Sequence, residues 1–286
     1  MGEIAYLNGQ WMKPADAKVS AEDRGFTFGD GVYEALVCYG GHIWGLERHL
    51  LRFERSLREI EIEGVDARAF GDIMREGVKR SGYSDAFIYA QVTRGAEPRT
   101  HDWKKGIIPT VFMTVREFKA YAEKYYREGV AVITVPEIRW ARCDVKSVNL
   151  LANVLAFHKA AAAGAYEAVF VCDDGTVTEG SKAGLFIVRG GTLITRETGE
   201  HILPSVTQGL VLEIARDLRI PTDERPFSKA EMTGADEVFV AGTTPMIMPV
   251  VRIDGAVVAT GKPGPVTARL LAGYRDRVKR ADDAPR

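Results

Sequence analysis

The apolar residues of this 286-residue chain change their spacing near residue 46, and this change limits the folds available to the chain. Residues 1–45 contain short apolar stretches separated by turn signals such as Asn8-Gly9, a pattern typical of β-hairpins. From residue 46, apolar side chains recur every three or four positions, which predicts an amphipathic helix over residues 46–60. The residues concerned are Leu46, Leu50, Phe53, Leu57 and Ile60. Strands and helices therefore alternate within one region, and the expected fold class is α+β.

The same patterns divide the chain into two expected domains. Residues 1–118 form an N-terminal α+β domain, and the charged residues 119–128 form a connector. Residues 129–286 form a C-terminal domain of further strands and helices. The N-terminal domain is completed by a helix over 67–81 and strands over 87–93 and 108–115.

Composition excludes several classes of protein. The formal net charge is −1, without the basic excess of a nucleic-acid-binding surface. No apolar run approaches the ~20 residues that span a bilayer, and the N-terminus lacks the pattern of a signal peptide. The three cysteines are odd in number and lack metal-site spacing, so a reduced, cytoplasmic protein with free thiols is expected.

Lys146 is the first candidate for chemistry. It lies between a β-rich segment and a helix expected over residues 149–163. A lysine in such a place can be held rigidly, with its amine directed into a cleft. Desolvation lowers the proton affinity of an amine, and a neutral amine can condense with an aldehyde to form a Schiff base. The alternative is an ordinary surface cation, and the residue alone does not decide between the two.

Glu179 follows an expected hairpin turn at Asp174-Gly175. A buried carboxylate next to a pyridine nitrogen would keep that nitrogen protonated and make the ring an electron sink. The alternative for Glu179 is a solvated turn residue.

Three further segments could bind an anion. Thr207 lies where a helix over residues 207–219 opens, so it is either a plain N-cap or a donor to a phosphate. Thr243 and Thr244 follow a strand and offer hydroxyls and free amides. Arg52 lies on the first helix, away from its apolar face, and is either solvated or a phosphate clamp.

The long polar loop 94–106 contains Arg99 and His101. Arginine binds a carboxylate through two parallel hydrogen bonds, and histidine can add a third donor. Tyr33 could supply a phenol to the same anion. The alternative is a surface loop with incidental charge.

In this order, the segments resemble the fold-type IV enzymes that depend on pyridoxal 5'-phosphate (PLP), the class IV aminotransferases, and within them the D-amino-acid transaminases. No single segment is decisive, but the ordered set is specific. The matching segments are residues 31–34, 49–52, 91–95, 98–101, 143–151, 178–181, 202–203 with 206–207, and 243–244 before 248–250.

The resemblance implies a fold of two α/β domains with the active site between them, and PLP as the cofactor. It implies that Lys146 forms the Schiff base with PLP and then moves the proton of the substrate Cα, while Glu179 holds the ring nitrogen. In this family the Arg-x-His loop reaches the site of the neighbouring subunit, so a homodimer is implied. Amino acids and keto acids are the implied small-molecule partners.

The resemblance also assigns the remaining site residues. Those implied to bind the cofactor phosphate are Arg52, Val206, Thr207 and Thr243. Leu203 is implied to pack on the cofactor ring. Those implied to bind the substrate are Tyr33, Arg99, His101 and Thr244.

The expected activity is transfer of an amino group from a D-amino acid to an α-keto acid, 2-oxoglutarate or pyruvate. Alternatives on the same fold are a branched-chain L-aminotransferase, an (R)-amine transaminase and an aminodeoxychorismate lyase, and a further alternative is a PLP-binding protein without turnover. The Arg-x-His pair favours the D-amino-acid enzyme. One departure from the family pattern is Lys182-Ala183-Gly184, where the family usually has a small polar residue followed by Ser-Asn. Lys182 either brings a new cation near the substrate or points to water.

Overall fold

The computed structural model describes residues 2–284, which form two compact units. The first unit comprises residues 2–119, Val145–Asn149 and residues 283–284, and the second comprises Ala120–Asp144 and Leu150–Asp282. The sequence assigns Lys146 to the C-terminal domain, but its segment Val145–Asn149 groups with the first unit. The reason is local, because the backbone of this segment is hydrogen-bonded to strand β3 (Gly31–Tyr39).

The first unit is built on a six-stranded sheet in the order β2-β1-β6-β5-β3-β4. Every neighbouring pair in it is antiparallel. The Asn8-Gly9 turn joins β1 to β2 as the sequence predicts, and both residues have the positive φ that favours Asn and Gly. Besides β3, the strands are β1 (Ile4–Leu7), β2 (Gln10–Met12), β4 (His42–Ile43), β5 (Ala86–Thr93) and β6 (Thr110–Glu117).

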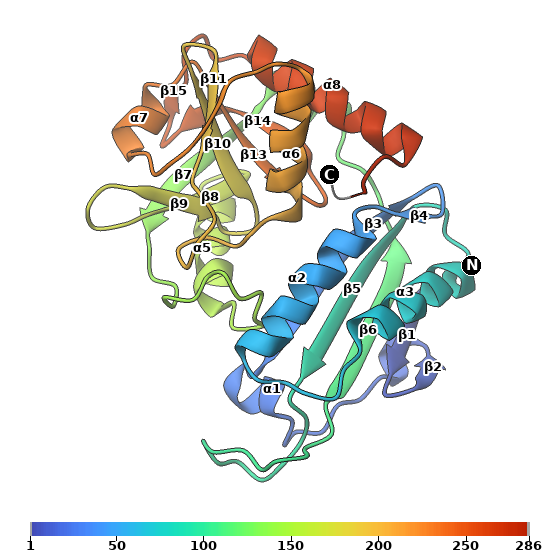
Figure 1. The fold of residues 1–286 in the computed structure, drawn as a ribbon. Coiled ribbons are helices and arrows are strands. Elements are labelled where there is room, and N and C mark those ends of the chain that lie inside the picture. The colour runs from blue at the N-terminus through green and yellow to red at the C-terminus, as the bar shows by residue number, and fades with distance from the viewer. Residues whose placement is uncertain (1, 285–286) are drawn as a thin grey trace. The chain divides into compact units, whose positions relative to one another are not determined.

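Helices α2 (Leu46–Glu59) and α3 (Ala67–Ser81) lie on one face of this sheet (Figure 1). Both occupy the ranges that apolar spacing predicts. The side chain of Asp66 caps the start of α3 by accepting from two backbone amides, and Gly82 ends it in a left-handed conformation. The short helices η1 (Pro14–Asp16) and α1 (Arg24–Phe28) are not evident from the apolar pattern.

The second unit is built on a nine-stranded mixed sheet in the order β12-β11-β10-β13-β14-β7-β8-β9, with β15 beside β14. The pairs β14–β7, β7–β8 and β11–β12 are parallel, and the others are antiparallel. The strands are β7 (Val130–Pro136), β8 (Glu167–Val171), β9 (Val177–Gly180), β10 (Gly184–Arg189), β11 (Thr192–Thr195), β12 (Thr222–Glu224), β13 (Glu237–Gly242), β14 (Met246–Ile253) and β15 (Ala256–Val257). Strands β9 and β12 are not predicted by the sequence pattern, since both are short.

The helices of the second unit are α4 (Glu123–Glu128), α5 (Leu151–Ala162), α6 (Val206–Asp217), α7 (Lys229–Thr233) and α8 (Pro265–Arg280). Helix α4 lies in the expected connector, where Tyr126 is buried and its hydroxyl donates to the carbonyl of Pro245 at 3.2 Å. The connector therefore contributes a packed helix to this unit. Ser228 and Glu231 form the capping box of α7 that their spacing predicts.

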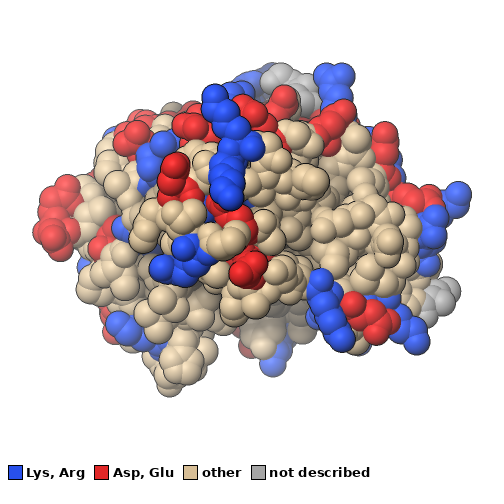
Figure 2. Space-filling model, turned by 90° about the horizontal axis from the view of Figure 1, so that it is seen from below, with Lys and Arg blue, Asp and Glu red and all other residues tan. Residues whose placement is uncertain are grey.

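The surface carries no evident large field of one sign on the face shown in Figure 2, where acidic and basic side chains are interspersed. Within residues 2–284, every helix falls short of the length and apolar character needed to cross a membrane. The same residues include no group of three or more His, Cys, Asp or Glu placed to hold a metal ion. Cys38, Cys143 and Cys172 are all free thiols.

Candidate active site

The backbone of Lys146 is held on both sides. The Tyr33 amide donates to the carbonyl of Lys146 at 3.0 Å, and the Val148 amide donates to that of Gly31 at 3.0 Å. The Lys146 amide itself donates to the hydroxyl of Ser56 on α2 at 3.2 Å. The segment thus extends the sheet at β3, and the rigid backbone expected for this lysine is present.

The side chain of Lys146 is half-buried rather than fully solvated. Its ammonium group lies 4.3 Å from the centre of the Tyr33 ring. That ring is stacked on Tyr89, with ring centres 5.6 Å apart. Burial and the neighbouring Tyr33 raise the pKa of Tyr89 to about 12, so its hydroxyl stays protonated at neutral pH. The stacked rings of Tyr33 and Tyr89 therefore limit the directions that the Lys146 amine can take.

Helix α2 buries a second, polar stripe beside its apolar one. His49, Arg52 and Ser56 repeat at helical spacing, and all three are buried. The Arg52 guanidinium donates to both carboxylate oxygens of Glu34, over 2.7 and 2.8 Å, and Nδ1 of His49 lies 2.6 Å from the same carboxylate. The interpretation of Arg52 as a solvated residue is therefore wrong, because Glu34 pairs with it inside the unit. We call Glu34, His49 and Arg52 the Glu34 network.

The members of the Glu34 network shift the pKa values of Glu34 and His49. Burial alone raises the pKa of Glu34, but the charges and hydrogen bonds of Arg52 and His49 outweigh it and hold that pKa well below the ordinary range. Burial lowers the pKa of His49, Glu34 opposes this, and Arg52 and Lys146 lower it further. The carboxylate is thus ionised at neutral pH, and a neutral imidazole is favoured beside it.

Glu179 lies on β9 and is buried, so its interpretation as a solvated turn residue is wrong. Its Oε1 accepts from the Arg139 guanidinium and from the backbone amide of Leu203 at 3.1 Å. Arg139 also donates to both oxygens of Glu137, whose Oε2 accepts from the hydroxyl of Thr178 at 2.8 Å. We call Glu137, Arg139 and Glu179 the Glu179 network.

In the Glu179 network, Arg139 sets the direction in which the pKa of Glu137 is shifted. Burial raises the pKa of Glu137, but hydrogen bonds and charge from Arg139 lower it below the ordinary value. Burial likewise works against the charge of Arg139, whose pKa the two carboxylates nevertheless raise. The guanidinium also lies 4.5 Å from the centre of the Phe170 ring. Glu137 and Arg139 are therefore held as a charged, hydrogen-bonded pair, and Arg139 also donates to Glu179.

The start of α6 is available to an anion. Ser205 is the N-cap, and its hydroxyl accepts from the Gln208 amide at 3.3 Å, so the interpretation of Thr207 as N-cap is wrong. Thr207 is buried in the first helical turn, where α-helices supply no acceptors for amides such as those of Val206 and Thr207.

Thr243 and Thr244 occupy the tight turn between β13 and β14, and both are half-buried. Their hydroxyls belong to the same unit as the start of α6. The structure thus places the predicted phosphate residues Val206, Thr207 and Thr243 in the second unit, and Arg52 in the first.

Arg99 and His101 are exposed in the loop between β5 and β6. The Arg99 guanidinium lies 4.7 Å from the centre of the Phe28 ring, and the His101 ring centre lies 5.4 Å from it. Among the residues the structure describes, neither side chain forms an ion pair with a carboxylate or a hydrogen bond with Tyr33 or Lys146. Arg99 and His101 are therefore brought together around one aromatic ring, and both side chains are exposed.

Four contributors to these networks are missing from the sequence prediction. Glu34 and His49 lie within segments that carry the family resemblance, and their adjacency to Tyr33 and Arg52 was the available signal. Glu137 and Arg139 follow β7 and carry no local signal. Only the packing of β7 beside β8 and of β8 beside β9 brings them to Glu179.

The unusual Lys182 is exposed, and its ammonium lies 3.8 Å from the centre of the Phe157 ring and 5.1 Å from that of Tyr166. The preceding Ser181 is tied down by hydrogen bonds to Glu167 and by the Asn153 amide, which donates to its carbonyl at 2.8 Å. Lys182 is therefore anchored on aromatic rings of its own unit.

The chain matches the family model of class IV amino-transferases over residues 31–253. It is 37% identical to the D-alanine aminotransferase of Staphylococcus haemolyticus over 277 residues, covering 96% of this chain and 97% of that relative. It is 36% identical to the D-alanine aminotransferase of Bacillus licheniformis, covering 95% and 96%. Among solved structures, a branched-chain amino acid aminotransferase with pyridoxamine 5'-phosphate, from T.th., is 28% identical, with a TM-score of 0.90 and coverage of 100% and 96%.

The chain therefore belongs to the class IV aminotransferases, and the predicted family and fold class are confirmed. It is an aminotransferase, and the predicted cofactor, PLP, is confirmed with the family. The functional groups found in the two units suit this cofactor chemically. They comprise a half-buried amine at Lys146, a buried carboxylate at Glu179 and the start of α6 with the Thr207 hydroxyl.

Proposed function

We propose that this aminotransferase moves the amino group of a D-amino acid to an α-keto acid, pyruvate or 2-oxoglutarate. The observation that carries the donor class is the exposed pair Arg99 and His101, whose side chains offer N–H donors and form no ion pair with a carboxylate among residues 2–284. The D-alanine aminotransferases that the chain resembles over nearly its full length support the same donor class.

The proposal gives the Lys146 amine two tasks. It would bind the cofactor covalently. Once the substrate amine displaces it, the free Nζ would take the proton from the substrate Cα and pass it to the cofactor. When bound, PLP supplies an electron-withdrawing ring that makes this Cα proton acidic. The hydrogen bonds that hold the Lys146 backbone keep the amine in place between the two tasks.

Other residues would hold the cofactor. Glu179 stabilises a proton on the ring nitrogen, and Leu203 packs on the ring while its amide orients the Glu179 carboxylate. Arg52, oriented by Glu34, contributes charge to phosphate binding. Three further residues are proposed to bind the phosphate together with Arg52, namely Val206, Thr207 and Thr243.

The substrate carboxylate decides which enantiomer reacts. Arg99 can bind it through two parallel hydrogen bonds, and His101, Tyr33 and Thr244 add further donors. A carboxylate fixed at one point leaves only one face of Cα toward the Lys146 amine. The proposal assigns that face to D-amino acids.

We further propose a homodimer. Helix α5 exposes an apolar row in which Leu151 is 68% and Val154 is 59% exposed, and Leu155 and Phe157 continue it. Apolar rows of this kind on a soluble surface mark contacts with another protein chain. Arg99 and His101 point outward from their own unit, as they would if they served a second copy. A cytoplasmic location fits the three free cysteines.

A donor screen tests the proposal. Purified enzyme with PLP is given D-alanine, L-alanine, L-leucine or (R)-1-phenylethylamine, each with pyruvate or 2-oxoglutarate as acceptor. For the alanine donors, 2-oxoglutarate is used, because pyruvate would return alanine. Turnover of D-alanine well above that of L-alanine and L-leucine supports the proposal. A preference for L-leucine would instead support a branched-chain L-aminotransferase, the activity named for the structural neighbour.

The role of Arg99 has its own test. Arg99→Ala should raise the KM for D-alanine about 10- to 100-fold, because a charge-assisted hydrogen bond contributes roughly 1.5–3 kcal/mol. The KM for (R)-1-phenylethylamine, which has no carboxylate, should change much less. Arg75→Ala, which removes a surface arginine on α3, is the matched control. Equal losses with both donors would show that Arg99 is structural.

A further inference from the structure

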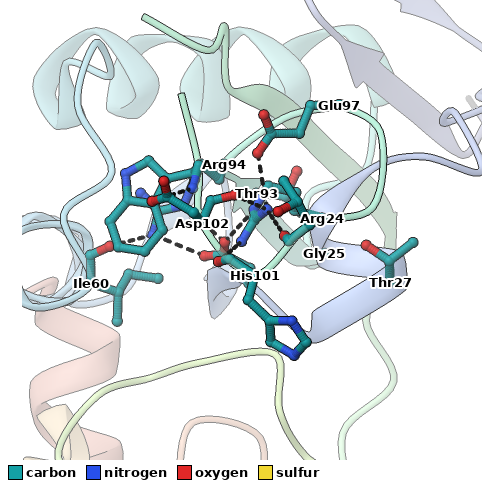
Figure 3. A network of polar contacts seen from close by, with 12 residues as sticks. Arg24, Gly25, Thr27, Ile60, Thr93, Arg94, Glu97, His101 and Asp102 are labelled. Carbon is teal, nitrogen blue, oxygen red and sulfur yellow. Dashed lines mark hydrogen bonds and ion pairs between the residues drawn. The ribbon is translucent and has the colours of Figure 1, made fainter. Parts of the chain in front are cut away.

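The loop that carries Arg99 and His101 has little regular structure of its own. Residues 94–109, which we call the Arg99 loop, join β5 to β6, and their tip is exposed. An exposed loop of this length does not hold two side chains in place by packing alone. Something else in the first unit must restrain it. The restraint comes from Asp23, the N-cap of α1, and from Arg24, whose contacts are drawn in Figure 3.

Asp23 closes the base of the loop. Its Oδ2 accepts from the hydroxyl of Thr93 at 2.9 Å and from that of Thr110 at 2.7 Å. Thr93 ends β5 and Thr110 begins β6, so one carboxylate ties the two ends of the loop together. The next glycine permits this approach, because a Cβ at Gly25 would lie 2.2 Å from the Thr93 methyl group.

Arg24 holds the tip. Only 3% exposed, it donates from Nη1 to the carbonyl of Thr100 at 2.7 Å and from Nη2 to that of His101 at 3.2 Å. A longer contact from Nη1 reaches the carbonyl of Asp102 at 3.4 Å. Glu97 and Asp30 accept from the same guanidinium at 2.9 and 2.8 Å. In Figure 3 the His101 imidazole points away from this network while its carbonyl faces Arg24.

We propose that Arg24 is a positioning residue for the substrate carboxylate, acting through the carbonyls of Thr100 and His101, which lie on either side of the His101 Cα and follow Arg99. The inference rests on the proposed function and extends it to a residue that would not touch the substrate. Because Arg24 binds the carbonyls of Thr100 and His101, it fixes the peptide planes on both sides of His101. The orientation of these planes sets the directions of the Arg99 and His101 side chains. Because a guanidinium offers its donors in a rigid planar fork, lysine cannot reproduce the arrangement.

Arg94 is a matched comparison in the same part of the unit. It is buried, it shares Asp30 with Arg24, and its guanidinium donates to the carbonyls of Ile60 and Glu61 at the end of α2. Arg94 is the first residue of the Arg99 loop, and its guanidinium meets the rest of that loop at the ring of Trp103, 4.0 Å from the ring centre. Loss of Arg94 therefore weakens the unit without releasing the carbonyls beside His101.

The experiment compares Arg24→Lys with Arg94→Lys in the full-length enzyme loaded with PLP. For Arg24→Lys, the KM for D-alanine should rise about 10- to 100-fold, since a small displacement of a binding group costs up to that much. The kcat and the bound PLP per chain should change little, and amide hydrogen exchange over residues 98–103 should become faster. Arg94→Lys should lower Tm to the same extent as Arg24→Lys does. It should leave the KM for D-alanine unchanged.

Three outcomes would overturn the inference. They are an unchanged KM in Arg24→Lys, an equal rise of KM in both variants, and a loss of PLP that accounts for the lost activity. If Arg24→Lys does not fold, Glu97→Gln removes one acceptor of the same guanidinium and should show a smaller rise of KM. If the wild-type enzyme uses L-alanine instead of D-alanine, the proposed function fails, and the role of Arg24 is judged from the same comparison with L-alanine.

Discussion

The Glu34 network and the Glu179 network each contain a buried glutamate, and their compositions are opposite. In the Glu34 network, one carboxylate accepts from an arginine and a histidine, and the Lys146 amine is close enough to lower the pKa of that histidine. In the Glu179 network, one arginine lies between two carboxylates, Glu137 and Glu179. The first network thus has an excess of basic groups, and the second has an excess of carboxylates.

This difference agrees with the roles proposed for Arg52 and Glu179. A phosphate needs basic groups nearby, and Arg52 belongs to the network that has them. A ring nitrogen keeps its proton only beside surplus negative charge, and Glu179 belongs to the network that has it. Buried charges are costly unless they are paired, so each network contains a partner that neutralises most of its charge.

The largest effect is expected from removing the amine beside the Glu34 network. Lys146→Ala should lower kcat for D-alanine by at least about 10³-fold, because both cofactor attachment and proton transfer depend on Nζ. Tm should change little, since neither network loses a member. Borohydride reduction followed by peptide mass spectrometry should place the cofactor on Lys146 in the wild type. Full turnover in this variant, with Lys182→Ala as control, would contradict the assignment.

The Glu179 network should respond unequally to loss of its two carboxylates. Glu179→Gln should lower kcat about 10²-fold, because the ring nitrogen loses a charge aimed directly at it. Glu137→Gln should have a smaller effect on kcat, because Glu137 acts only by holding Arg139. Steady-state kinetics at saturating PLP measures both. Equal kcat values in the two variants would mean that kcat depends on the number of carboxylates in the network and not on the position of Glu179.

The smallest effect on kcat, and a large one on stability, is expected at Glu34. Glu34→Gln should lower the free energy of unfolding by about 3–5 kcal/mol, since a buried ion pair with Arg52 is broken. Urea denaturation at neutral pH measures the loss.

The pH dependence sharpens the Glu34 prediction. The folded-state pKa of Glu34 is depressed, so its stabilising contribution is present above the unfolded-state pKa of about 4.3 and is lost as the pH falls toward the folded value. The wild type should therefore lose stability steeply on acidification below about pH 4.3, and Glu34→Gln less steeply. Parallel curves for the two proteins would show that Glu34 is not the group responsible.

Local sequence accounts for most of the fold. The spacing of Leu46, Leu50 and Phe53 predicts α2, because helical periodicity is a property of neighbouring residues. Asn8-Gly9 predicts its turn because few other residues tolerate positive φ. Short elements such as α1 and β9 escape prediction, since a few residues do not establish a period. The site residues Lys146, Glu179 and Arg99 were found through the ordered resemblance to the family, and their roles stay predictions.

By itself, the sequence determined which of the longer helices and strands form, which family the chain belongs to and which residue types are available for chemistry. Only the tertiary structure decided which charges are paired. Arg24 and Thr100 are 76 positions apart, and Arg139 and Glu179 are 40 apart, yet each pair is in hydrogen-bond contact. Periodicity and turn chemistry act over a few residues, whereas ion pairing depends on strand order and register, which are set only when the whole unit packs.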